Sequence, residues 1–281
     1  MPLHHRGGIG FLVLAALMVL PADVAGAAER LRLDGPLMQG GLVRATAAPG
    51  ASVRLDGRPV RVSPEGLFLL GFGRDASGEA RLEVTWPDGR REVRVLEVAS
   101  RRYEVQRIDG LPPELVTPGP EDLARAKREA AMVRRARWRD DPRTDFLDPF
   151  IWPVTGRITG VYGSRRVLNG NPRRPHYGID IVAPPGTPVM APAAGVVTFV
   201  HPDMFFSGAT LILDHGHGLS SGFLHLQDIL VVEGERVARG QPIATVGASG
   251  RVTGPHLDWR LNWFQTRLDP ALVVGPMPAG R

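Results

Sequence analysis

Two parts of the chain alternate apolar and polar residues over short runs, which is the pattern of β-strands. Between about residues 30 and 100 the runs LVRATA, ASVRLDGRPVRV, ARLEVTW and REVRVLEV are separated by glycine, proline and Asp-Gly turns. Between residues 150 and 275 the runs GIDIVAP, ATLILDHG and PHLDWRLNW are likewise separated by turns rich in glycine and proline. We therefore predict a mainly β protein, with an immunoglobulin-like β-sandwich at residues 30–100 and a second strand-rich domain at residues 150–275.

Between the two strand-rich parts lies a segment whose apolar residues recur with a different, helical spacing. In the run PGPEDLARAKREAAMVRRARW, residues 118–138, the apolar side chains recur at helical spacing at Leu123, Ala126, Ala130 and Val133. Proline and acidic residues come first and arginines come last, which complements the helix dipole. The segment predicts one connecting helix, followed by a linker from Asp140 to Pro149.

The run VVEGERVARGQPIATVG in the second domain is typical of a β-hairpin such as those of lipoyl and biotinyl carrier domains. A carrier needs an exposed lysine at the tip of such a hairpin. Residues 150–275 contain no lysine at all, so the hairpin is predicted and the carrier function is excluded.

The first residues have the layout of a secretory signal peptide. Arg6 precedes the apolar run Phe11 to Leu20, and the small residues Ala25-Gly-Ala27 follow. The run is shorter than the ~20 apolar residues that span a membrane. We predict a signal peptide at residues 1–27, cleavage near Ala27, no stable membrane span afterwards, and an exported, periplasmic protein.

The amino-acid composition excludes several kinds of functional site. The sequence has no cysteine, so disulfides, thiolate metal sites and thiol nucleophiles are excluded, and a metal has to bind histidine, aspartate or glutamate. The formal net charge of +5 is modest and spread along the chain, without a basic stripe that carries interleaved aromatic residues. We therefore expect no nucleic-acid partner.

His176 and Asp180 lie four residues apart in RPHYGIDIVAPP, where glycine, proline and β-branched residues argue against a helix. In a straight strand the two residues would lie ~13 Å apart, too far to share one ion. Joint ligation therefore requires a bend between them, which Gly178 permits.

His256 and Asp258 in TGPHLDW are two residues apart, so on a strand their side chains share a face at ~6.6 Å. His225, in SSGFLHLQDI, lies in another strand-like run. A lone histidine in a β domain is usually structural or exposed, but these residues gathered in one cysteine-free domain favour a metal site. The remaining histidines of the domain, His215, His217 and His201, fall at predicted turns or loops.

The series PHYGIDIVAPPGTPV, FLHL and GASGRVTGPHL resembles the lysostaphin-type family of zinc peptidases, which cleave peptide bonds in bacterial peptidoglycan. The resemblance covers roughly residues 152–263 and implies an antiparallel β-sheet peptidase domain that holds one Zn²⁺ ion. It implies His176 and Asp180 as zinc ligands, with His225 and His256 assisting catalysis. The family's last ligand is the second histidine of an H-x-H element, and Asp258 stands there instead; a carboxylate is also a chemically suitable zinc ligand.

The resemblance implies a zinc endopeptidase that hydrolyses the peptide cross-links of peptidoglycan, with peptide stems as its substrate. The altered ligand leaves an alternative, an inactive protein that binds peptidoglycan or activates another cell-wall hydrolase. The first β-module has no catalytic cluster, and we expect it to act as a spacer, to bind the wall, or to contact a cell-wall partner protein.

Overall fold

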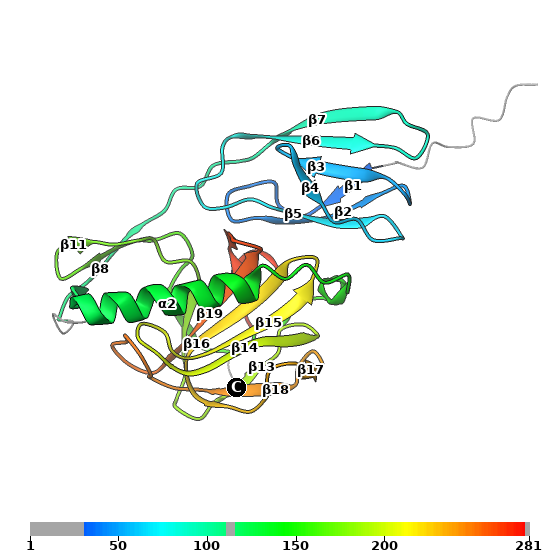
Figure 1. Ribbon diagram of the computed structural model, residues 1–281. Helices are drawn as coiled ribbons and strands as arrows, with labels where there is room; N and C mark the ends of the chain where they lie inside the picture. Colours follow the sequence, from blue (N-terminus) through cyan, green and yellow to red (C-terminus); the bar gives the residue numbers. More distant parts are fainter. Residues whose placement is uncertain (1–30, 111–115, 279–281) are drawn as a thin grey trace, which may run out of the picture. The chain divides into compact units, whose positions relative to one another are not determined.

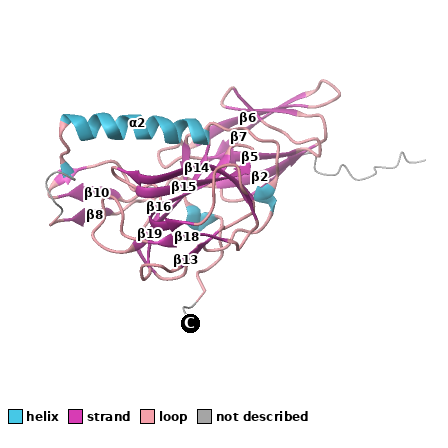
Figure 2. Ribbon diagram, turned by 60° about the horizontal axis from the view of Figure 1, so that its bottom comes forward, coloured by secondary structure: helices cyan, strands magenta, loops and turns pink. Residues whose placement is uncertain are grey.

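The computed structural model describes residues 31–110 and 116–278, so the predicted signal peptide at residues 1–27 lies outside the described residues. Strands are the main regular structure of the described chain, and the long helix α2 lies along them (Figure 1, Figure 2). The prediction of a mainly β protein is therefore confirmed. Among the described residues no helix has the length and apolar character needed to cross a membrane.

The first β-module consists of two small antiparallel sheets. One has the order β1-β2-β5, formed by Leu31–Asp34, Leu42–Ala47 and Leu67–Gly71. The other has the order β4-β3-β6-β7, formed by Arg58–Val60, Ser52–Leu55, Glu79–Thr85 and Arg91–Glu97. The alternating apolar residues of both sheets meet in one core that includes Val43, Phe68, Leu70, Leu82 and Val84. A two-layer β arrangement therefore accounts for the period-two pattern of this region.

The chain then adds a strand that the sequence pattern does not indicate. β8, Val105–Ile108, pairs in parallel with β10, Arg165–Leu168, and β11, Asn171–Pro172, pairs with the other edge of β10. The segment after the first module thus forms a small sheet with the second domain.

Helix α2 spans Pro120–Arg137, inside the range predicted for it. Its start contains Pro120 and two acidic residues and its last turn contains three arginines, as the charge pattern indicates. Of the apolar positions at helical spacing, Val133 packs with Met132 and Ala136 against Phe199, Met204 and Ile212, whereas Leu123 is exposed. The helix therefore docks through its second half, onto β14 and β15.

The second domain is built on one large sheet with the order β17-β14-β15-β16-β19-β12-β9. β13 and β18 pair with each other, β18 also pairs with β16, and β20 pairs with β19. These strands have the following bounds in chain order: β9 Arg157–Gly160, β12 Ile179–Val182, β13 Pro188–Met190, β14 Gly195–Met204, β15 Gly208–Gly216, β16 Leu219–Ile229, β17 Arg236–Val237, β18 Pro242–Val246, β19 His256–Trp263 and β20 Thr266–Leu268. Short 3-10 helices span Asp145–Leu147 and Pro270–Leu272.

The predicted hairpin in VVEGERVARGQPIATVG is wrong. β17 and β18 are not paired with each other, because β17 pairs with β14 while β18 pairs with β13 and β16. The intervening turn, closed by the hydrogen bond from Gln241 N to Ala238 O, carries the chain from one neighbour to another. The local turn chemistry is correct, but the strand partners are chosen by the rest of the sheet.

The segment predicted as a linker, residues 140–149, is packed rather than loose. Phe146 is 1% exposed, and Asp145 forms ion pairs with Arg143 and Arg236. This segment is therefore an integral part of the second domain.

Candidate metal centre

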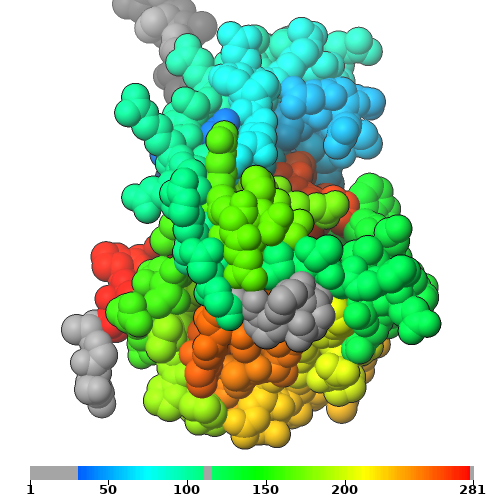
Figure 3. Space-filling view, turned by 90° about the vertical axis from the view of Figure 1, so that its left-hand side faces the viewer, coloured from blue at the N-terminus to red at the C-terminus, as the bar shows by residue number. Residues whose placement is uncertain are grey.

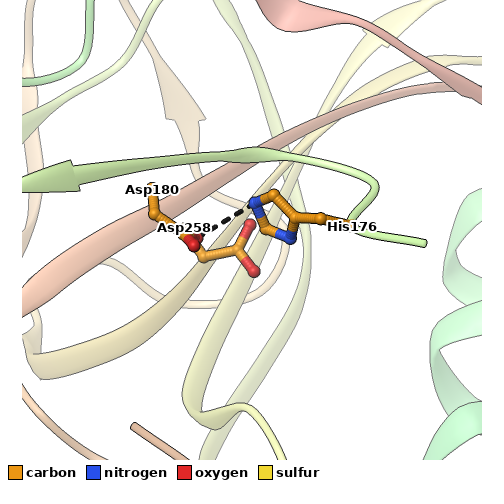
Figure 4. A group of neighbouring side chains, drawn as sticks. All are labelled: His176, Asp180 and Asp258. Carbon is orange, nitrogen blue, oxygen red and sulfur yellow. Dashed lines mark ion pairs between the residues drawn. The ribbon is translucent and has the colours of Figure 1, made fainter. Parts of the chain in front are cut away.

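His176, Asp180 and Asp258 come together in the second domain. Each offers one ligand atom, and these atoms all lie within 4.8 Å of one another. All three side chains are buried, and in Figure 4 the imidazole of His176 faces the two carboxyl groups. His176 Nε2 lies 3.1 Å from Asp180 Oδ1. The chain therefore bends between residues 176 and 180, as joint ligation requires.

The strand register places the two carboxylates side by side. Asp180 of β12 and Asp258 of β19 are direct partners across the antiparallel pair. Gly178 makes room for the second of them, since a Cβ at this position would lie 2.3 Å from Asp258 Oδ1. Gly160 of β9 does the same for Asp180, because its Cβ would lie 2.1 Å from Asp180 Oδ2. Two glycines thus allow two buried carboxylates to occupy neighbouring strands.

Several atoms of this group have no hydrogen-bond partner among the described residues: both ring nitrogens of His176, and Asp180 Oδ1. The close approach of His176 Nε2 to Asp180 Oδ1 lacks the alignment of a hydrogen bond. Buried polar atoms without a partner cost free energy and are uncommon. One imidazole nitrogen and two carboxylates directed at a common point are a donor set that suits Zn²⁺, so the residues present fit this metal.

Each carboxylate is also held by an arginine. Arg166 forms an ion pair with Asp180 Oδ2, which leaves Asp180 Oδ1 for the metal. Arg260 donates from Nη2 to Asp258 Oδ2 at 2.6 Å, and its Nε lies 3.1 Å from Asp258 Oδ1. Burial raises the pKa of both carboxyl groups, but His176 followed by Arg166 outweighs it at Asp180, and Arg260 followed by His176 outweighs it at Asp258, so the pKa of each is lowered. Both aspartates are therefore ionised at neutral pH, as metal ligands need to be.

Asp258 also faces a wider group of buried arginines. Arg137 of α2 and Arg267 of β20 are both largely buried, and burial together with neighbouring guanidinium groups lowers the pKa of each. The Asp258 carboxylate counteracts this lowering for both arginines. Asp258 therefore belongs both to the group that could hold a metal ion and, as its anion, to a basic cluster.

His225 and His256 lie beside the three ligand residues, with ring centroids 5.0 Å apart. His225 Nδ1 lies 2.8 Å from Ser249 O, and His256 Nδ1 lies 2.8 Å from Gly254 O. A carbonyl oxygen only accepts, so Nδ1 of each ring carries a proton. His256 Nε2 is 3.8 Å from Asp180 Oδ1, which places it against the ligand group.

The environment of His225 keeps its ring neutral. Burial lowers the pKa of His225 to about 4, although the nearby Asp258 carboxylate acts in the opposite direction. The backbone of His225 has a φ of 63°, an uncommon conformation for a residue with a side chain. Strained backbone of this kind is often found at functional sites. A neutral imidazole is able to accept a proton at physiological pH.

The other histidines of the domain are not part of this group. His215 is fully buried, and its two ring nitrogens lie 2.8 Å from Ala194 O and 2.8 Å from Ser221 Oγ. Burial lowers its pKa to about 4. His217 is a turn residue with a φ of 48°, as its glycine neighbours indicate, whereas His201 lies within β14 rather than in the predicted loop.

A pocket of about 400 Å³ opens onto Asp180, His225 and His256. One wall comes from Gln106 and Ile108 of β8, and Figure 3 shows the teal segment that contains β8 running down to the orange segment around residue 250. Sequence reasoning missed this wall and both arginines that hold the carboxylates. The sequence could have indicated Arg260, because it lies two residues after Asp258 on the same strand face. Nothing local in the sequence indicates that Arg166 contacts Asp180.

Comparisons with known proteins agree with this arrangement. Residues 174–270 match the model of peptidase family M23. The peptidoglycan DD-endopeptidase ShyA of Vibrio cholerae is 30% identical over 202 residues, 68% of this chain and 42% of the relative. The DD-carboxypeptidase/endopeptidase Mpg of Neisseria meningitidis is 35% identical over 132 residues, 47% of this chain and 30% of the relative. The chain thus spans less than half the length of these curated relatives.

A solved structure covers nearly the whole architecture. A protein from Pseudomonas aeruginosa, described as an M23 peptidase, is 32% identical and superposes with a TM-score of 0.66 over 85% of this chain and 95% of its own. This likeness includes the segments before the family match at residue 174. Together with the buried ligand group, it shows that the chain belongs to peptidase family M23.

Proposed function

We propose that this protein is a zinc-dependent endopeptidase that hydrolyses peptide cross-links of bacterial peptidoglycan after export to the periplasm. The observation that carries the proposal is the juxtaposition of a buried His-Asp-Asp group with two histidines, His225 and His256, that line the same pocket as Asp180. The names of the curated relatives, which are peptidoglycan endopeptidases, support the substrate class.

His176, Asp180 and Asp258 would hold one zinc ion. Bound zinc supplies Lewis-acid chemistry, which acidifies water and polarises a peptide carbonyl. The donor set fits, since all three residues present a ligand atom to one place and the pKa of both aspartates is lowered, which keeps their carboxylates ionised.

Asp258 replaces a neutral imidazole with a charged carboxylate, and Arg260 offsets that charge. The Asp258–Arg260 ion pair is neutral as a unit, so the total charge around the metal resembles that of a site with one aspartate and two histidines. Asp258 and Arg260 therefore act together, because the arginine lies two residues further along the same strand.

The two histidines perform the proton chemistry. Both rings line the pocket, so Nε2 of one of them accepts a proton from the attacking water, and this imidazolium then gives the same proton to the leaving amine. The other histidine, when its Nε2 carries a proton taken from solvent, donates a hydrogen bond to the oxyanion of the tetrahedral intermediate. The hydrogen bonds to Ser249 O and Gly254 O hold both rings in the tautomer that this requires.

One observation favours a second function, that of a non-catalytic protein that binds peptidoglycan or activates another wall hydrolase. Both ligand carboxylates already have an arginine partner, so their charge is compensated without a metal. Such a protein would keep the pocket and bind no zinc.

The deciding experiment measures the zinc content of the purified mature protein and its cleavage of isolated sacculi, with and without a chelator. The wild type is compared with Asp258→Ala, with Asp258→His, and with the double variant Asp258→His, Arg260→Gln. The double variant is needed because a histidine alone would leave the Arg260 guanidinium without its anion.

For the enzyme we expect about one zinc ion per chain and release of cross-link fragments, both lost in Asp258→Ala. A wild type that binds no zinc and cleaves nothing, while the double variant gains zinc, would establish the non-catalytic function instead.

A further inference from the structure

One face of the large sheet carries a group of polar side chains. In the register of β19, Asn262 lies opposite Ser220 of β16 on one side and opposite Arg267 of β20 on the other. Directly opposed residues project from the same face of a sheet, and so does Arg260, two residues before Asn262 on the same strand. These four side chains therefore share one face.

Helix α2 packs on the same face. Gly222 of β16 lies opposite both Ile212 of β15 and Arg260 of β19, and Ile212 packs against the helix. Arg137, the last residue of α2, is 5% exposed. Burial, followed by the charges of Arg267 and Arg260, lowers the pKa of Arg137 well below the usual value for arginine. The end of the helix thus brings a third guanidinium group close to the two on the sheet.

Several polar atoms of this group are buried without a partner. Four of them have no hydrogen-bond partner in the part of the chain that the structure describes: Arg137 Nη1, Arg267 Nη1, Ser220 Oγ and Asn262 Oδ1. Buried polar atoms without a partner cost free energy, and a guanidinium group only donates hydrogen bonds. A ligand that satisfies both arginines must therefore accept hydrogen bonds.

The positive charge of the group also exceeds its negative charge. Asp258 and Asp214 lie on the same face, but each already forms an ion pair with another arginine. Burial, followed by the charge of Arg260, lowers the pKa of Arg267 to about 10, so this side chain is cationic at neutral pH. A buried arginine such as Arg137 also keeps its proton. The two guanidinium groups therefore favour an anion between them.

Arg267 can be reached from solvent. It lines a pocket of about 670 Å³ together with Arg174 and Tyr177. The central carbon of its guanidinium lies 5.6 Å from the centroid of the Tyr177 ring. The acidic residues of this lining all belong to the first module, so an ion that enters along the second domain meets arginines.

We infer that Arg137 and Arg267 bind a small inorganic oxyanion, of the sulfate or phosphate type, between the end of α2 and the β19–β20 pair. The planar guanidinium group forms charge-assisted hydrogen bonds to such oxyanions, and the Ser220 hydroxyl is a further donor. The bound anion would join the helix to the sheet beside the Asp258–Arg260 ion pair. Neither arginine lines the pocket that contains His225 and His256, so this site is separate from the proposed catalytic one. The inference does not depend on the endopeptidase function.

The test measures the binding of sulfate to the purified protein by titration calorimetry, and the Tm of the protein as sulfate replaces chloride at constant ionic strength. The wild type is compared with Arg137→Gln and Arg267→Gln. Arg135→Gln is the matched control, since Arg135 is an exposed arginine two residues earlier on α2 and the change in net charge is the same.

For the wild type we expect saturable binding of one sulfate ion, and a Tm that rises by about 3–5 °C for each tenfold increase in sulfate above the dissociation constant. Arg137→Gln and Arg267→Gln should each weaken sulfate binding by at least about tenfold, because each removes hydrogen bonds between charged groups. Arg135→Gln should bind sulfate as the wild type does.

The variant Arg137→Met separates loss of the anion site from loss of folding, because it keeps an apolar side chain of similar length and removes the charge. In chloride its Tm should equal or exceed that of the wild type, since a buried cation without an acceptor is removed. In sulfate its Tm should fall below that of the wild type.

Three results would overturn the inference. The first is a wild type with the same Tm in sulfate and chloride and no heat of binding. The second is sulfate binding that persists unchanged in both Arg137→Gln and Arg267→Gln, which would place the ion elsewhere on the protein. The third is a large fall in the Tm of Arg137→Met in chloride, which would mean that the chain itself already satisfies this guanidinium.

Discussion

Charged residues are mostly exposed in the first β-module, whereas the large sheet of the second domain buries several of them. In the module, arginines and acids alternate along the solvent face and form exposed pairs within one strand or turn, such as Arg81 with Glu83 and Arg94 with Glu92. The core beneath them is apolar. In the large sheet, His176, Asp180 and Asp258 are buried among apolar residues, and part of this polar group has no hydrogen-bond partner among the described residues.

The exposed charged residues of the first module keep the fold soluble, whereas the buried charged residues of the second domain are kept for chemistry. Exposed pairs contribute little to stability and lose little when they are removed. Buried carboxylates require compensation, which the second domain supplies through Arg166 and Arg260. The two regions should therefore respond differently to equivalent substitutions.

The largest effect is expected at the two histidines of the pocket. His225→Ala or His256→Ala should lower kcat by about 10² to 10⁴, the usual contribution of general acid-base catalysis, with zinc retained. Turnover of isolated sacculi and zinc content are measured on the same preparations. Loss of zinc in both variants would show that they are ligands and would reverse the role assignment.

Substitution of the module core should affect stability alone. Leu82 is fully buried, so Leu82→Ala should lower the free energy of unfolding by about 2–5 kcal/mol, measured by denaturant titration. The neighbouring Arg81 faces solvent, and Arg81→Gln should change the free energy of unfolding by less than about 0.5 kcal/mol. A drop in zinc affinity in Leu82→Ala would contradict the separation of the two regions.

The smallest effect, and the sharpest comparison, concerns one ion pair from each region. Arg260 orients the Asp258 carboxylate, so Arg260→Gln should weaken zinc binding by about 10- to 100-fold, as is usual when the partner of a metal ligand is removed. The control Arg94→Gln removes an exposed pair and should leave zinc binding unchanged. Competition with a chromophoric chelator measures both affinities. Tighter zinc binding in Arg260→Gln would mean that the arginine competes with the metal for the carboxylate.

Much of the site was accessible from short motifs. The spacing of His176 and Asp180 around Gly178 predicted a bend, and the structure has it, with His176 Nε2 and Asp180 Oδ1 3.1 Å apart. The two-residue spacing of His256 and Asp258 placed both on one strand face, toward the same group. The functional roles of these residues remain predictions for the variants above to test.

The hairpin of residues 231–247 was mispredicted, and the apolar spacing of the helix did not specify which of its residues pack, for one reason. Turn residues and local periods specify where a strand or helix can form, but not which neighbour it meets. β17 and β18 have different partners, and α2 packs through Met132, Val133 and Ala136 while Leu123 is exposed. Both outcomes depend on contacts between residues far apart in the chain.

The sequence by itself determined the β-rich class, the range of the helix at residues 120–137 and, with the family resemblance, the His-Asp-Asp group as a candidate metal site, because period, turn chemistry and residue type are local properties. Only the tertiary structure decided that Arg166 and Arg260 compensate the two carboxylates, that β8 supplies a wall of the pocket, and that three arginines line it. These features arise from strand register and from the packing of distant segments. Electrostatic compensation acts through space, so the pattern of residues along the chain does not contain it.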